Sequence, residues 1–139
     1  MQYTPKKSKF KKYHKGKKLF KVKNTLNTIK LNTNLGLKST EPGRLTSKQI
    51  LVLKQNINKI IKKRGKNFIR IFPATGVSKK PKEIRMGKGK GAIDHWTFKV
   101  KAGVLLCEMF VLSLATGLKA LKLVQKKLPF KTKILKKIN

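Results

Sequence analysis

The chain carries far more positive than negative charge, and this imbalance limits what it can fold into. Its 139 residues include 37 Lys or Arg and only 4 Asp or Glu, which gives a formal net charge of +33. Repulsion between cations that lack acidic partners opposes compaction of the free protein, whereas a phosphate backbone would neutralise them and release condensed counterions. The charge therefore predicts a polyanion partner, with nucleic acid the first candidate.

Length and composition set the size and class of the fold. With 39% hydrophobic residues, the chain can build one domain with a modest core. Cys107 stands alone in an apolar run, which excludes an internal disulfide and predicts a small buried hydrophobe. The most apolar stretch, residues 103–118, is interrupted by Glu108 and is shorter than the roughly 20 residues of a membrane span. We therefore expect no membrane partner.

The N-terminal segment is dominated by lysine. Residues 6–23 hold ten lysines and no acid, and such a run cannot pack a core of its own. We predict that residues 1–24 form an arm that orders on its partner; a solvated tail is the alternative. Phe10 and Tyr13 lie within this run, where they could stack on bases. The segment has Lys where transit peptides favour Arg and Ser, so we assign it to the mature protein.

Signals at both ends predict one helix after residue 45. Thr46 is a capping residue with Gln49 three positions later, and Leu45 with Ile50 forms a hydrophobic staple. The helix should run to about Arg64, with Gly65 in the left-handed position that ends it. Its inward face comprises Ile50, Leu53, Ile57, Ile60 and Ile61.

The remainder of residues 25–139 predicts a second helix and several strands. The second helix covers about residues 113–128 and ends at Pro129; its inward side chains are Leu114, Leu118, Leu121 and Leu128. Strands are expected at residues 29–31, 35–37, 67–72 and within 131–139. Residues 73–83 should form a loop, and residues 93–101 and 104–109 a hairpin. The pattern predicts one α+β domain, two helices packed on a mostly antiparallel sheet, with a basic N-terminal arm and C-terminal tail.

A glycine-lysine loop precedes the expected hairpin. Gly87, Gly89 and Gly91 let the backbone approach a partner closely, and the intervening Lys88 and Lys90 add charge. The spacing fits neither the phosphate-loop nor the dinucleotide pattern. We interpret residues 80–92 as a basic loop that contacts nucleic-acid backbone; a plain flexible tip is the alternative.

The sequence offers little material for catalysis. Its four acids are scattered and its two histidines, His14 and His95, are far apart. No carboxylate pair, nucleophile with its base, or metal-ligand spacing emerges, so we predict a non-enzyme without metal or cofactor. His95 and Trp96 lie in an expected strand, where edge and core positions are favoured over a base-stacking platform.

A series of short motifs runs along almost the whole chain. They comprise residues 5–10, 13–17, 43–50, 65–66, 69–73, 80–81, 85–91, Trp96, 108–109 and 127–132. In this order and nearly this spacing, the series resembles the large-subunit ribosomal protein L-sixteen family of bacterial and organellar type, whose archaeal and eukaryotic relatives are named L-ten-e.

The resemblance implies a hammerhead-like arrangement of strands and two kinds of RNA contact. The N-terminal arm would thread into large-subunit rRNA, and the basic loop would point toward the A-site and P-site tRNA near the peptidyl transferase centre. The implied rRNA-binding residues are Lys6, Lys7, Lys9, Phe10, Lys11, Lys12, Tyr13, His14, Lys15, Lys17, Lys18, Arg44 and Arg70. The implied tRNA-site loop comprises Lys82, Arg85, Met86, Gly87, Lys88, Gly89, Lys90 and Gly91.

The resemblance also implies a structural constituent of the large ribosomal subunit with protein neighbours, present as one copy and not as a homo-oligomer. Residues 50–53, Ile-Leu-Val-Leu, depart from the small and charged residues usual there, which leaves a neighbouring protein as a second partner of that face. The chain holds 33 Lys, 8 Asn and 11 Ile, all with AT-rich codons. We therefore expect an organelle-encoded protein of the mitochondrial ribosome, with plastid or bacterial cytoplasm as alternatives.

Two rival functions remain at this point. A DNA-compacting protein would share the charge, but no element resembles a recognition helix for a DNA groove. A membrane-active cationic peptide would need one long amphipathic helix, which the strand-rich middle of the chain contradicts.

Overall fold

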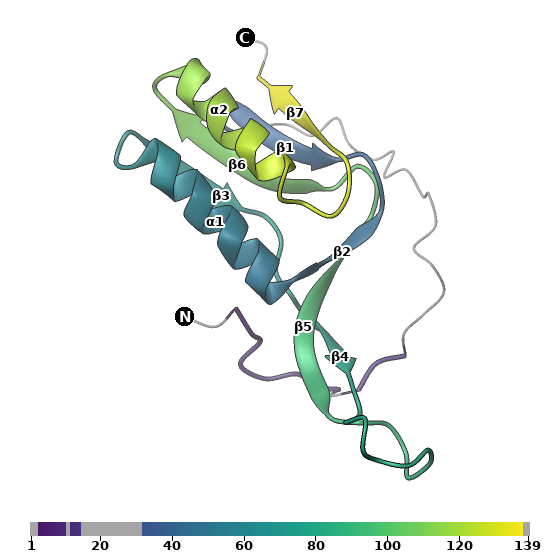
Figure 1. The fold of residues 1–139 in the computed structure, drawn as a ribbon. Helices are drawn as coiled ribbons and strands as arrows, with labels where there is room; N and C mark the ends of the chain where they lie inside the picture. The colour runs from purple at the N-terminus through teal and green to yellow at the C-terminus, as the bar shows by residue number, and fades with distance from the viewer. Residues whose placement is uncertain (1–2, 11, 15–31, 138–139) are drawn as a thin grey trace.

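The computed structural model describes residues 3–10, 12–14 and 32–137. Two helices cover one face of a four-stranded sheet of order β3-β6-β1-β7, and a three-stranded sheet of order β2-β5-β4 extends away from them (Figure 1). The strands of both sheets pair antiparallel throughout the described residues. The α+β prediction is confirmed. The elements are β1 (Leu35–Ser39), β2 (Gly43–Thr46), α1 (Ser47–Ile61), β3 (Gly65–Ile69), β4 (Thr75–Ser78), β5 (Ile93–Val100), β6 (Leu105–Val111), α2 (Leu114–Gln125) and β7 (Thr132–Lys136).

The first helix begins as its capping signal predicts. The Thr46 side chain accepts a hydrogen bond from the Gln49 backbone N–H at 3.3 Å, and the Gln49 side chain accepts one from the Thr46 N–H at 2.9 Å. The end of the helix was predicted wrongly, because α1 stops at Ile61 and Lys62 takes the positive φ of 53°. Gly65 instead starts β3, where a Cβ atom would collide with the Phe110 carbonyl oxygen.

The core lies between the helices and the four-stranded sheet. Of the predicted α1 stripe, Ile60 is only half-buried, whereas the other four residues are buried. In α2 the predicted inward face was partly wrong: Leu114 is 51% exposed and Leu128 lies beyond the helix end. The buried face of α2 comprises Gly117, Ala120, Leu121 and Val124. Small residues serve there because a Cβ on Gly117 would lie 2.6 Å from Leu35 Cδ1.

The predicted hairpin of residues 93–109 is wrong in its pairing, although both strands exist. β5 pairs with β2 and β4, whereas β6 pairs with β1 and β3, so the two consecutive strands belong to different sheets. Gly103, with φ 94°, lies in the turn between them and donates its N–H to the Ser39 carbonyl at 2.8 Å. This bond to β1 directs the chain from the smaller sheet into the larger one.

The remaining strand and loop predictions have different outcomes. The terminal strand is confirmed as β7, and β1 confirms the strand expected at residues 35–37. The predicted loop at residues 73–83 was partly wrong, because β4 occupies its first half and pairs with β5. The strand expected at residues 67–72 is β3, which starts and ends earlier. The strand expected at residues 29–31 lies outside the described residues.

A buried carboxylate joins β6 to its surroundings. Glu108 is 1% exposed and forms an ion pair with Arg70, with Oε1 2.7 Å from Nη2. Its Oε2 accepts the Asn32 backbone N–H at 3.2 Å and lies 3.5 Å from the Thr33 hydroxyl. An ionised group can be buried only when it is paired in this way. Cys107, the neighbouring residue, is fully buried as predicted.

Candidate nucleic-acid interface

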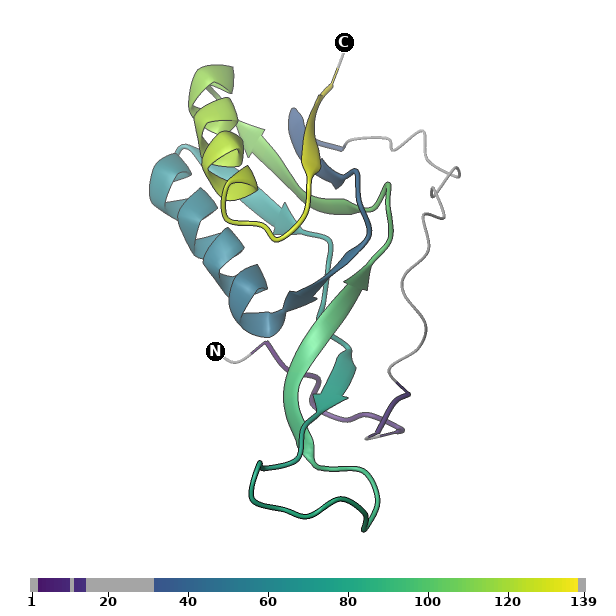
Figure 2. The same ribbon diagram turned by 45° about the vertical axis from the view of Figure 1, so that its right-hand side comes forward.

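The basic loop of residues 80–92, here called the finger, projects from the far end of the smaller sheet (Figures 1 and 2). Its base is closed by the Lys79 N–H, which donates to the Ala92 carbonyl at 3.1 Å. Residues 81–90 are all exposed, and Met86 is fully so. The finger therefore presents its side chains to a partner and contributes little to the core.

Backbone geometry explains the alternating glycines of the finger. Gly87, Lys88 and Gly89 all have positive φ, at 110°, 53° and 77°, a region that glycine enters at little cost. No atom lies within 4 Å of a Cβ built on Gly87 or Gly89, so these two glycines serve conformation and not packing. Gly91 differs, because a Cβ there would lie 2.5 Å from the Lys79 carbonyl oxygen.

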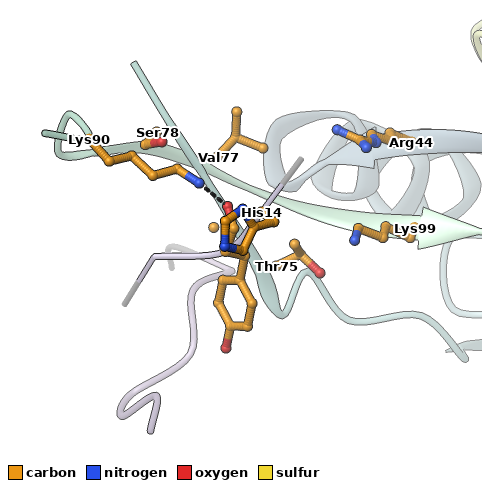
Figure 3. A pocket seen from close by; sticks show the side chains of 9 residues that line it. His14, Arg44, Thr75, Val77, Ser78, Lys90 and Lys99 are labelled. Carbon is orange, nitrogen blue, oxygen red and sulfur yellow. Dashed lines mark hydrogen bonds between the residues drawn. The ribbon is translucent and has the colours of Figure 1, made fainter. Parts of the chain in front are cut away.

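The described part of the arm contacts the base of the finger. Lys12 Nζ donates to the Lys90 carbonyl at 2.7 Å, and Lys90 Nζ donates in return to the Tyr13 carbonyl. Figure 3 shows this second bond beside His14. Two segments almost 80 residues apart are thus held together by a reciprocal pair of bonds, which we call the latch. The latch turns the Lys90 ammonium toward the arm.

A cavity of about 230 Å³ opens beside the latch. Figure 3 shows His14 with Lys90 on one side and Arg44 and Lys99 on the other. Arg44 and Lys99 are directly opposite each other in the β2–β5 pairing, where like charges are destabilising. None of the described residues that line the cavity is acidic. A bound phosphate would relieve the repulsion, so the cavity suits an anion.

The structure brings together only some of the predicted site residues. Tyr13, His14, Arg44 and Lys90 line one cavity, and the remaining loop residues lie on the exposed part of the finger. Arg70 lies elsewhere, on the four-stranded sheet, where it is 47% exposed and paired with Glu108. Lys6, Lys7, Lys9, Phe10 and Lys12 are exposed along the arm. Lys11, Lys15, Lys17 and Lys18 lie outside the described residues.

Sequence reasoning did not identify Lys99, Thr75 or Ser78 as lining residues of this cavity. Nothing in the sequence around Lys99 distinguishes it from other lysines, and only the register of β5 places it opposite Arg44. Thr75 and Ser78 belong to β4, the strand that was expected to be loop. The missing signal in each case was strand pairing.

The titratable groups outside this cavity include no cluster of metal ligands among the described residues, since no three His, Cys, Asp or Glu side chains there gather in a group that could hold a metal ion. Burial raises the pKa of the Cys107 thiol to about 12, with a smaller contribution from Glu108. Such a thiol stays protonated and is a poor nucleophile.

Among the described residues, neither helix has the length and the apolar composition that a membrane-spanning helix needs.

A basic α+β domain with an exposed cationic finger and an anion-suited cavity has the features of a protein that binds a polyanion. The family model for ribosomal protein L16p/L10e matches residues 5–135. The large ribosomal subunit protein uL16 of Psychrobacter arcticus is 41% identical over 133 residues, 96% of each chain. The uL16 of Karelsulcia muelleri is 42% identical over 131 residues, covering 94% of this chain and 95% of the relative. That of Cereibacter sphaeroides is also 42% identical over 131 residues, covering 94% and 93%.

The chain therefore belongs to the L16p/L10e family of ribosomal proteins. The family resemblance drawn from the short motifs is confirmed.

Proposed function

We propose that this protein is a structural constituent of the large ribosomal subunit, where it binds large-subunit rRNA and helps position tRNA near the peptidyl transferase centre. Family membership, the net charge of +33 and the cationic finger support this proposal. In this assignment the ribosomal RNA performs peptide transfer and the protein organises it. The protein itself acts without catalytic residues, cofactor or membrane partner, as one copy among neighbouring ribosomal proteins.

The proposal divides the chain into two functional parts. Residues 1–24 form the arm that threads into rRNA, and residues 25–139 form the domain that carries the finger. The exposed cations of the arm and the cavity beside the latch provide the protein's contacts with rRNA phosphates. Such contacts supply affinity that depends on salt and not on sequence. The tRNA side of the interface comprises Lys82, Arg85, Met86, Gly87, Lys88, Gly89, Lys90 and Gly91.

One observation carries the tRNA assignment: every residue from 81 to 90 is exposed and the segment carries four cations against one acid. The test is Lys88→Gln in large subunits that contain this protein. We expect tRNA binding to the A site to weaken by about 3- to 10-fold, because one charge-assisted contact is worth roughly 1 kcal/mol at an exposed position. Incorporation of the protein into large subunits should stay unchanged.

Lys62→Gln is the matched control. Lys62 and Lys88 share the same exposed state and the same φ of 53°, but Lys62 follows α1, away from the finger. The control should leave tRNA binding intact. If Lys88→Gln instead lowered incorporation and tRNA binding to the same degree, the finger would be architectural and the tRNA role would be wrong.

We also propose that the protein acts in a mitochondrial ribosome and is encoded in the organelle. The abundance of Lys, Asn and Ile supports an AT-rich genome. The relatives named above are bacterial, which is compatible with an organellar or a bacterial ribosome. The locus that encodes the chain decides between mitochondrion, plastid and bacterium.

A further inference from the structure

A second cavity, of about 450 Å³, lies where the first described residues of the arm meet the start of α1 and the start of β5. It is separate from the finger and from the cavity beside the latch. Tyr3 comes from the arm, Ser47 and Lys48 from the first turn of α1, and residues 93–96 from β5. Three segments distant in sequence thus enclose one concave site.

Rings are concentrated around this cavity. Tyr3, His95 and Trp96 all line it, and all three are half-buried. The expectation of core and edge positions for His95 and Trp96 is therefore wrong. Trp96 is not in the buried core, and β5 is the middle strand of its sheet, not an edge. Aromatic rings that are neither packed in a core nor fully exposed are suited to stacking on a planar ligand.

An acidic side chain at the same cavity is unusual in so cationic a protein. Asp94 lines the site and its side chain is 49% exposed. A hydrogen bond from His95 to Oδ2, at 2.8 Å, lowers the pKa of the Asp94 carboxyl group below its usual value, and the charges of His95, Lys79 and Lys48 act in the same direction. The carboxylate is thus held ionised, and it repels phosphates. It can still accept hydrogen bonds from a donor on a ligand.

We propose that this cavity binds one unstacked RNA base that carries an exocyclic amine. The base stacks against Trp96 and Tyr3, its amine donates to Asp94, and Lys48 at the rim contacts the adjoining phosphate. RNA-binding proteins recognise single-stranded bases by this combination of ring stacking and edge hydrogen bonds. The inference rests on the proposed function in one respect, namely that the macromolecular partner is RNA.

The carboxylate gives the site a preference among bases. Cytosine presents its N4 amine to an acidic side chain, which is the usual pairing of Asp or Glu with this base. Uracil has a carbonyl oxygen at the same position, and its lone pairs would face the carboxylate. Cytosine should therefore be bound in preference to uracil, and a ribose-phosphate chain without bases should not occupy the cavity.

Trp96 is the only tryptophan in the chain, so its fluorescence reports on this cavity alone. The full chain is titrated with oligocytidine, oligouridine and an abasic ribose-phosphate oligomer of equal length, while anisotropy of a labelled oligomer measures total binding. We expect strong quenching of Trp96 by oligocytidine, roughly tenfold weaker occupancy by oligouridine, and none by the abasic oligomer, although all three bind through charge.

Asp94→Asn should abolish the preference for oligocytidine and keep total binding. Glu83→Gln is the matched control, because it removes one exposed negative charge from the finger; it should leave the preference intact. The proposal is overturned if the three oligomers quench Trp96 equally, or if Asp94→Asn behaves like Glu83→Gln. Loss of anisotropy change with every oligomer would instead contradict the RNA-binding function itself.

Discussion

At the residue scale, the buried neighbours on β6 show how local environment sets chemistry. The buried Glu108 side chain has three polar neighbours, namely Arg70, the Asn32 N–H and the Thr33 hydroxyl. Burial, with a smaller contribution from Glu108, raises the pKa of the thiol of Cys107, one position earlier, so this thiol stays protonated. Because Arg70 is paired with Glu108, its guanidinium forms a contact within the protein. Glu108 also contacts Asn32 and Thr33, so this group of residues connects the segment at residues 32–33 to the sheet.

The Cys107 thiol predicts a pH dependence of stability. Its pKa rises from 9.0 to about 12 in the folded protein, so between these values the unfolded state binds fewer protons and stability falls as pH rises. A pKa difference of one unit corresponds to about 1.4 kcal/mol, so the free energy of unfolding falls by about 4 kcal/mol in total once the pH exceeds the folded-state pKa. About 1.4 kcal/mol of this loss falls between pH 8 and pH 10, and guanidinium chloride unfolding at these two pH values measures it, with lysine repulsion screened by the denaturant.

Cys107→Ala provides the comparison. The variant should be less stable at pH 8, because a small cavity replaces the thiol, but it should lose less stability than the natural chain between pH 8 and pH 10. Lysine titration is common to both proteins and cancels in the difference. Parallel losses in the two proteins would mean that the thiol ionises equally easily in the folded state.

At the element scale, close approach between α1, β3 and β6 depends on Gly65. A Cβ at this position would meet the Phe110 carbonyl oxygen and would lie 2.8 Å from Ile61 Cγ2. We expect Gly65→Ala to lower the free energy of unfolding by about 2 to 3 kcal/mol, since overpacking against a paired strand forces the backbone apart. Equilibrium unfolding of the variant measures this loss.

Gly89→Ala is the control that distinguishes the effect of steric collision on stability from the effect of backbone conformation. Gly89 has φ 77° and open space around it, so its substitution should cost only about 1 kcal/mol, the expense of a left-handed residue with a side chain. Both changes reduce the freedom of the unfolded chain alike. If the two variants were equally destabilised, steric crowding at Gly65 would not be the cause.

The elements also show what the sequence can and cannot predict. The start of α1 was predictable because Thr46 and Gln49 contact each other within one turn. The partners of β5 and β6 were not, because the same alternation of side chains suits a hairpin or two different sheets. Gly103 illustrates the limit: its turn was expected, but the bond to Ser39 that redirects the chain is made across 64 positions.

The candidate site was predictable to the extent that its residues adjoin one another in sequence. The finger is one continuous basic segment, and its exposed state and positive φ values agree with its glycine-lysine pattern. The two cavities were not predictable, since Arg44 with Lys99 and Tyr3 with Trp96 meet only after folding. No pattern of neighbouring residues in the sequence predicts which distant residues will line the same cavity.

At the scale of the whole molecule, the latch links the arm to the finger. The Lys12 ammonium donates to the Lys90 carbonyl, and the Lys90 ammonium donates to the carbonyl of Tyr13 in the arm. An arm fixed by rRNA would thereby restrain the base of the finger, and the glycines at 87 and 89 would leave only its tip adaptable. Positioning of the tip is then a property of both segments together.

The latch predicts that one substitution in the finger loosens the arm. Lys90→Ala should raise amide hydrogen exchange by about 2- to 5-fold both near residues 12–14 and near residues 79–92, because an exposed charge-assisted bond contributes little more than 1 kcal/mol. Lys88→Ala, which removes an equal charge two positions away, should affect the tip and leave the arm unchanged. Exchange followed by mass spectrometry resolves the two segments. An arm that exchanges at the same rate in both variants would show that the two segments move independently.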